Sequence, residues 1–213
     1  MQGEICQERP EEHRAVEILV REAFWNQYGP GCMEHYLLHL LRSHPDFVPQ
    51  LDLAAMLDGK PVGQCACVKG TLFGDDGTQR GVLTLGPIAV HPDFQKQGIG
   101  GMLLARTARI AKELGYPAIF LTGDPAYYSR QGYLPARQFG IRNEENCYAA
   151  ALQVLLLKDN VLVPGRYEES RAYQVTEPAA EEFDRQFPPK EKCTGTPSQL
   201  RFLELAAKVV PAE

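Results

Sequence analysis

The feature that most constrains the fold is an apolar run followed by a glycine-containing turn, a helix and a second apolar run. Residues 82–90 are apolar almost throughout, which is typical of a strand covered on both faces. Residues 99–114 have helical periodicity, and residues 118–122 form a second buried strand. Short links between a strand, a helix and a strand predict a βαβ unit whose two strands are parallel.

The rest of the chain predicts further helices and strands around this unit. Helices are expected at residues 10–26, from a break at 28–31 to about His44, and over a short stretch that begins at 123–125 and ends at Gly132. Strands are expected at 51–57 and 60–73, joined by a turn at Asp58-Gly59, and near 134–141 and 148–157. The expected inward faces are Met33, Tyr36, Leu37 and Leu40 in the second helix, and Ile99, Leu103, Ile110 and Leu114 in the helix of residues 99–114.

Beyond about residue 174 the chain becomes polar and is interrupted by prolines. Thr196 as N-cap, Pro197 in the first turn and Gln199 as the third residue of a capping box predict a last helix. Its expected apolar face is Phe202, Leu205, Ala206 and Val209. We therefore expect one domain over residues 1–173 and a C-terminal extension over 174–213 with a terminal amphipathic helix. This helix either packs against its own domain or contacts the second subunit of a homodimer.

Composition narrows the class of partner. The 213 residues are 44% hydrophobic and carry a formal net charge of −5, which argues against a general nucleic-acid or anionic-membrane binder. The N-terminal residues lack the apolar stretch of a signal peptide, and no run is long enough to span a membrane. The six cysteines contain no CxxC pair. These features predict a cytoplasmic protein with reduced thiols and without nucleic-acid or membrane partners.

The turn between the first apolar strand and the helix has the character of an anion-binding site. Gly98 and Gly100 let the main chain approach a ligand closely. The amides of residues 97–101 lack helical acceptors at the N-terminus of the helix, where the helix dipole also favours an anion. Lys96 adds a positive charge. The turn therefore predicts main-chain binding of a phosphate.

Three phosphate-binding loops can be compared with this turn. The Rossmann pattern requires a third glycine where this chain has Leu103, and the Walker A pattern requires a Lys-Ser/Thr pair after the second glycine, which is absent. The spacing of Gln95, Gly98 and Gly100 instead resembles the Q/R-x-x-G-x-G/A loop of the GCN5-related N-acetyltransferase (GNAT) superfamily.

The resemblance extends beyond the loop, over about residues 5–170. The lead-in of residues 85–92, the helix that follows and the segment of residues 123–133 all resemble the superfamily, and the last of these is similar to its bacterial YhbS-like branch. The resemblance implies an α/β fold with a central, mostly antiparallel mixed sheet flanked by helices. In that fold one parallel pair of strands splays apart and holds acetyl-coenzyme A in the gap.

The residue type at position 87 also favours such a gap. Proline has no amide hydrogen to donate to a neighbouring strand, so Pro87 favours a bulge or a sheet edge. A bulge would free main-chain groups of residues 88–90 for the pantetheine amides. The resemblance implies the following coenzyme-binding residues: Ile88, Ala89, Val90, Gln95, Lys96, Gln97, Gly98, Ile99, Gly100 and Gly101. No metal is expected for this chemistry.

Tyr128 stands four residues before Gly132, where many members of the family carry a tyrosine near the thioester sulfur. An ordinary phenol has a pKa of ~10 and a thiol one of ~8.5, so the tyrosine is the weaker acid. We therefore expect Tyr128 to donate a hydrogen bond to the departing thiolate, with late proton transfer. Tyr127 is the alternative, because adjacent helical residues point ~100° apart and only one of them should face the sulfur.

The acceptor side carries fewer signals. Many relatives use a glutamate in the fourth strand as a base, whereas residues 82–90 contain no acid. The candidate bases are Asp124, Glu34, His35 and His91. Trp25 and Tyr28 are the residues expected to line the acceptor site.

Together these features predict an enzyme that transfers an acetyl group from acetyl-coenzyme A to a primary amine of a small molecule or peptide, by direct attack in a ternary complex. Because the acid of the fourth strand is missing, a non-catalytic, regulatory acyl-coenzyme A-binding module is the alternative. A third hypothesis is an interaction protein whose C-terminal helix mediates assembly.

Overall fold

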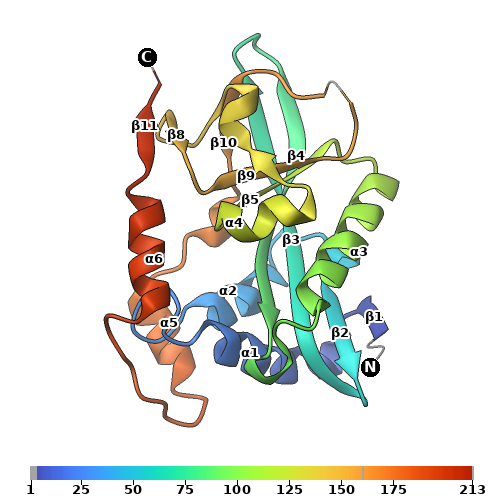
Figure 1. Ribbon diagram of the computed structural model, residues 1–213. Coiled ribbons are helices and arrows are strands. Elements are labelled where there is room, and N and C mark those ends of the chain that lie inside the picture. The colour runs from blue at the N-terminus through green and yellow to red at the C-terminus, as the bar shows by residue number, and fades with distance from the viewer. Residues whose placement is uncertain (1–3, 160, 213) are drawn as a thin grey trace.

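The computed structural model describes residues 4–159 and 161–212 and shows a mixed sheet with helices on both faces (Figure 1). The strands of the main sheet are β1 (Glu4–Gln7), β2 (Leu53–Leu57), β3 (Lys60–Gly74), β4 (Gln79–Val90), β5 (Ala118–Thr122), β6 (Leu134–Pro135), β7 (Ile141–Arg142), β9 (Leu152–Leu156) and β10 (Gly165–Glu168). Their order is β1-β2-β3-β4-β5-β9-β6, with β10 paired to β3 and β7. A second, small sheet joins β8 (Cys147–Ala149) to β11 (Val209–Pro211).

The helices are α1 (His13–Phe24), α2 (Glu34–Leu41), α3 (Ile99–Glu113), α4 (Pro125–Tyr128), α5 (Glu177–Asp184) and α6 (Pro197–Ala206). The two faces of the sheet are covered by different helices, as Figure 1 shows. Leu103 and Leu104 of α3 are buried in one apolar cluster with the strands. Val16 and Val20 of α1 and Leu38 of α2 are buried in another, on the opposite face. In the described residues, no helix combines the length and apolar character that a membrane span requires.

Strands β4 and β5 form the parallel pair expected from the sequence. They pair only at Leu83 with Ile119 and at Thr84 with Phe120, so the rest of β4 diverges from β5. On its other side β4 pairs with β3, where Cys67 faces Leu85 and Cys65 faces Ile88. Two residues of β4, Gly86 and Pro87, thus oppose one residue of β3, which is a bulge at the predicted place. The predicted fold class is confirmed.

The expected inward face of the second helix is wrong. Met33 and Leu40 are 42% and 37% exposed, and the buried residues of α2 are His35, Leu38 and Leu41. The helix is too short and too apolar for periodicity to select one face. Other elements select it: Leu38 packs in the cluster of α1 and the sheet, and an aspartate of α5 contacts His35.

Two further expectations require correction. Leu114 is 42% exposed, because α3 ends at Glu113 and Gly115 turns the chain in the left-handed conformation with φ of +88°. The stretch 134–141 is not one strand, since a short 3-10 helix at Ala136–Phe139 separates β6 from β7. Strands of two residues carry too few alternations to be recognised in a sequence.

The C-terminal helix begins as predicted, with Thr196 and Gln199 completing the capping box. Its expected face is mostly wrong: Leu205 is buried, but Phe202 is 39% exposed and Val209, which is 37% exposed, belongs to β11. The region after residue 174 also contains α5, which we did not expect. The division into a domain at 1–173 and an extension at 174–213 stays a prediction.

The extension contacts α1 through buried polar groups. The guanidinium of Arg21 donates to both carboxylate oxygens of Asp184, at 2.6 and 3.1 Å. The indole nitrogen of Trp25 donates to the carbonyl of Glu191 at 2.7 Å. These contacts place α5 and the following linker beside the loop between α1 and α2 (Figure 1).

Candidate active site

A cleft of about 670 Å³ lies between the end of β4, the N-terminus of α3 and α4. Its walls contain most of the predicted coenzyme-binding residues, namely Ile88, Val90, Gln95, Lys96, Gly98, Ile99, Gly100 and Gly101. Two predicted residues do not line it. The side chain of Ala89 is buried on the α1 face of the sheet, and Gln97 faces a smaller neighbouring hollow. The binding roles of all ten residues stay predictions.

The loop before α3 has a backbone shaped for close contact with a ligand. Lys96 and Gly98 have φ of 61° and 86°, in the left-handed region. For a lysine this conformation costs about 1 kcal/mol or more, and such strain is concentrated at functional sites. Gly98 is the N-cap of α3 and has no side chain to occupy the first amides. The loop therefore presents main-chain donors to the cleft.

Two glutamines fix this loop from within. The side-chain amide of Gln95 donates to the carbonyl of Val90 at 3.1 Å, and that of Gln97 donates to the carbonyl of Asp93 at 3.2 Å. The first bond connects the loop to the end of β4. It also uses one main-chain acceptor that we had expected to be free for the coenzyme.

The adjacent tyrosines of α4 occupy different places. Their ring centroids are 5.0 Å apart with the planes at 86°. The hydroxyl of Tyr127 lies over Gly100, where an added Cβ would be 2.5 Å from it. The ring of Tyr128 packs inward against Tyr133, at 5.6 Å between centroids. Burial raises the pKa of Tyr128 well above its ordinary value, so this phenol keeps its proton.

Arg130 and Gln131 also line the cleft, and the sequence reading gave them no role. Arg130 adds a second cation to that of Lys96. Their place in the sequence could have indicated this role, because both residues come just before Gly132. That glycine ends the helical segment with φ of +84°.

A second hollow, of about 320 Å³, lies between the loop that joins α1 to α2 and the C-terminal extension. Trp25 and Tyr28, the predicted acceptor-site residues, both line it. The carboxylates in its walls are Glu34, Glu177, Glu181 and Asp184. Sequence reasoning missed the three from α5, although Thr176 followed by Glu177-Pro178 is a recognisable helix start.

Helix α6 lies next to both hollows. Arg201 of α6 pairs with Asp124, the N-cap of α4, at 2.9 Å, so this helix reaches the wall of the coenzyme cleft. Tyr28 contacts Phe202 of α6, with ring centroids 5.0 Å apart. We therefore take the second hollow as the candidate acceptor site.

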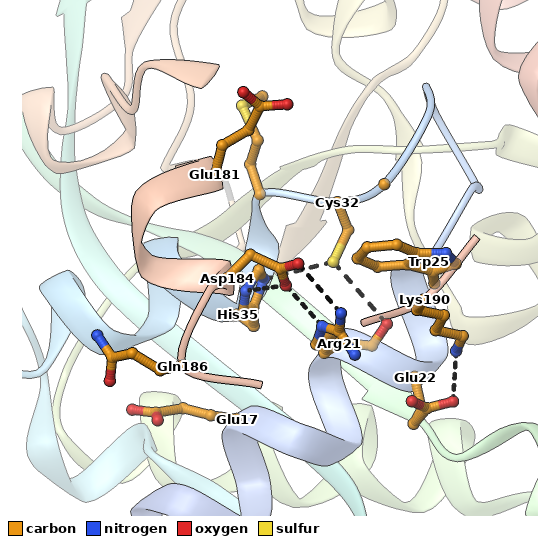
Figure 2. Close-up of polar contacts among 12 residues, drawn as sticks. Glu17, Arg21, Glu22, Trp25, Cys32, His35, Glu181, Asp184, Gln186 and Lys190 are labelled. Atoms are coloured by element: carbon orange, nitrogen blue, oxygen red, sulfur yellow. Dashed lines mark hydrogen bonds and ion pairs between the residues drawn. The ribbon is translucent and has the colours of Figure 1, made fainter. Parts of the chain in front are cut away.

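Beneath this hollow, Cys32, His35 and Asp184 form a line of contacts that Figure 2 shows. The thiol sulfur lies 3.3 Å from Nδ1 of His35, and Nε2 lies 3.1 Å from the carboxylate of Asp184. Burial, then Glu34 and Asp184, raise the pKa of Cys32, and burial lowers that of His35 to about 4. The thiol is thus kept protonated beside a neutral imidazole. The line positions Asp184 and does not supply a thiolate nucleophile.

The four candidate bases lie in different environments. Asp124 accepts from the amide of Ala126 at 2.9 Å and pairs with Arg201, which holds its pKa below the usual range. His91 does not line the acceptor hollow, and its Nδ1 accepts from the amide of Asp93 at 3.3 Å. His35 is occupied as described above.

Glu34 is the remaining candidate, and it lines the acceptor hollow. Its carboxylate accepts from the amide of Met33 at 3.0 Å. Burial raises the pKa of Glu34, although hydrogen bonds from the backbone amides of Glu34 and Met33 oppose the rise. A carboxylate with a raised pKa accepts a proton more readily than an ordinary one.

Comparison with known proteins agrees with this arrangement. The model of the acetyltransferase (GNAT) family matches residues 10–133, more than half of the chain. The chain therefore belongs to the GNAT family of acyltransferases.

Within that family the chain falls in the YhbS-like branch. The uncharacterized N-acetyltransferase YhbS of Escherichia coli (strain K12) is 30% identical over 73% of this chain and 87% of its own length. The uncharacterized N-acetyltransferase YjhQ of the same strain is 32% identical over 41% of this chain, and the match spans 48% of YjhQ.

Solved structures show the same fold. The crystal structure of YhbS from Escherichia coli in complex with CoA has a TM-score of 0.71 and 26% identity, and the match covers 82% of this chain and 93% of that one. A GNAT family acetyltransferase from Brucella melitensis in complex with acetyl-CoA has a TM-score of 0.63 and 24% identity, covering 81% and 99%. The second likeness concerns the fold alone.

Proposed function

We propose that the protein is an N-acetyltransferase that moves an acetyl group from acetyl-coenzyme A to a primary amine by direct attack in a ternary complex. The observation that carries this proposal is the separation of β4 from β5 beside the anion-binding loop, with the phenol of Tyr128 next to the cleft.

The coenzyme would bind mainly through the protein backbone. The amides at the start of α3 would hold the pyrophosphate, and Lys96 and Arg130 would add positive charge. The main chain of residues 88–90, unpaired on its β5 side, would bind the pantetheine amides. The complex of YhbS with CoA supports this assignment.

The chemistry requires a neutral amine that attacks the thioester carbonyl. A C–N bond forms, the C–S bond breaks, and its electron pair leaves with the sulfur. Main-chain N–H groups of the splayed strand would stabilise the oxyanion. Tyr128 would donate a hydrogen bond to the thiolate, and its raised pKa favours this role over early proton transfer.

Deprotonation of the acceptor is the costly step for an alkylamine. A lysine-like amine with a pKa of ~10.4 requires about 4.6 kcal/mol to become neutral at pH 7. Glu34, as the carboxylate of the acceptor hollow with a raised pKa, is the base that the geometry favours, directly or through water.

We further propose that the enzyme is cytoplasmic and binds neither nucleic acid nor membranes, in line with its net charge of −5. A homodimer stays a prediction. The exposed side chains of Leu200 and Leu203 on α6, each 60% exposed, are where a second subunit would make contact.

Two measurements test the proposed function. Calorimetry with acetyl-coenzyme A tests the cleft, and release of the free thiol with a panel of amines tests turnover. Binding followed by turnover is the expected result. Binding without turnover across the panel would favour the non-catalytic regulatory module, and a lack of affinity at millimolar coenzyme would refute both.

A further inference from the structure

The acceptor hollow contains more negative than positive charge. Of its four carboxylates, Asp184 is paired with Arg21 and Glu181 with Lys192. Glu34 and Glu177 have no cationic partner among the described residues. A cation that entered this hollow would therefore meet negative charge that no cationic side chain balances.

The hollow already holds an alkylammonium group, which is that of Lys192. This side chain passes over Gly31, where an added Cβ would be 3.1 Å from its Cε atom, and reaches Glu181 on α5. Its pKa is raised first by the hydrogen bond with Glu181, with Glu177 and Asp184 adding to the rise. The walls therefore accommodate a primary ammonium on a flexible aliphatic chain, independently of any count of acidic residues.

The hollow is also placed to receive part of the acceptor. Tyr28 lies in its wall and contacts Phe202 of α6, the helix whose Arg201 pairs with the N-cap of α4. Phe24 and Trp25 supply further apolar surface. An aliphatic chain along this surface would connect an amine at the thioester to a second group among the carboxylates.

We propose that this hollow is a subsite for a second ammonium group, so that the preferred acceptors are aliphatic amines with two or more positive charges. The inference rests on the proposed function and specifies its substrate class. The amine that is acetylated lies at Tyr128 with Glu34 as its base, and the distant ammonium lies beside Glu177.

Matched acceptors test this inference. Cadaverine and n-pentylamine have the same carbon chain and differ in one terminal ammonium, as do putrescine and n-butylamine. With acetyl-coenzyme A saturating, we expect kcat/KM to be at least about ten-fold higher for each diamine than for its monoamine. The ratio should fall at least about five-fold in Glu177→Gln. Lys192→Met, which removes a competing positive charge, should lower KM for cadaverine.

The control is Glu182→Gln, which removes a carboxylate from α5 that is 70% exposed and does not line the hollow. Its diamine preference should equal that of the unmodified protein. Equal turnover of diamine and monoamine, or a preference that survives Glu177→Gln, would overturn the inference. The proposed function fails in a different way, by giving no turnover with either amine. Even then, calorimetry measures the affinity of the protein for cadaverine and for n-pentylamine. Equal affinities would exclude the second-ammonium subsite.

Discussion

The ring of Tyr128 lies against Gly123, so closely that a Cβ atom at position 123 would be 2.3 Å from Cε2 of the tyrosine. Gly123 follows the last residue of β5 and comes just before Asp124, the N-cap of α4. Glycine at this position is therefore a condition for the phenol to reach its place beside the splayed strands.

Gly123→Ala should displace the ring of Tyr128 and lower turnover while coenzyme affinity is kept, because the loop before α3 is untouched. Steady-state kinetics and calorimetry measure the two effects. The matched control is Gly81→Ala in β4, where an added Cβ meets nothing within 4 Å. Normal kcat in Gly123→Ala would show that the position of Tyr128 does not matter.

Substitution of Tyr128 and of Tyr127 by phenylalanine should affect different kinetic properties. Tyr128→Phe removes the donor to the thiolate and should reduce kcat at least about ten-fold with little change in coenzyme affinity. Tyr127→Phe removes a hydroxyl that lies over Gly100 and should change mainly coenzyme affinity. If the two effects are exchanged, Tyr127 is the residue that faces the sulfur.

The left-handed conformation of Gly98 should be required for coenzyme binding. Gly98→Ala forces a Cβ into this conformation at a cost of about 1–2 kcal/mol and disturbs the first amides of α3. We expect coenzyme affinity to fall about ten-fold.

Gly115→Ala is the control for Gly98→Ala, since Gly115 has φ of +88° at the other end of α3 and lies outside the cleft. Thermal unfolding should show a similar loss of stability in both variants, with coenzyme affinity kept only in Gly115→Ala. Equal affinities would mean that the loop geometry is not used for binding.

A buried pair of carboxyl groups should make stability depend on pH. Burial first, then Asp52, raise the pKa of Glu8, and the pKa of Asp52 is raised by burial. Between the ordinary glutamate pKa of 4.5 and the raised value, the folded state binds more protons than the unfolded state. The free energy of unfolding should therefore fall as the pH rises through this interval.

Glu8→Gln should flatten this dependence, which urea unfolding at about pH 5 and about pH 8 would measure. Glu11→Gln serves as the control, because the Glu11 side chain is 66% exposed and, in the part of the chain that the structure describes, pairs only with exposed Arg9. A slope that is the same in Glu8→Gln and in the unmodified protein would contradict the prediction.

The coenzyme half of the fold was predictable because its signals are local. The bulge at Pro87, the glycines of the loop and the parallel pair all follow from residues that are close in sequence. The capping box of Thr196 is equally local and was also found.

The acceptor half was not predictable, because its walls come from segments far apart in the chain. The contact of Arg21 with Asp184 spans 163 positions, and nothing near either residue indicates its partner. For the same reason the buried face of α2 was wrong, since His35 is buried by residues of α5.

Lys192 and the three acids of α5 come from a segment outside residues 10–133, which the family model matches. This segment supplies no wall of the coenzyme cleft, so exchanging it between related enzymes should leave that cleft in place. Chimeras that carry another tail should thus inherit the donor chemistry from one parent and the choice of amine from the other.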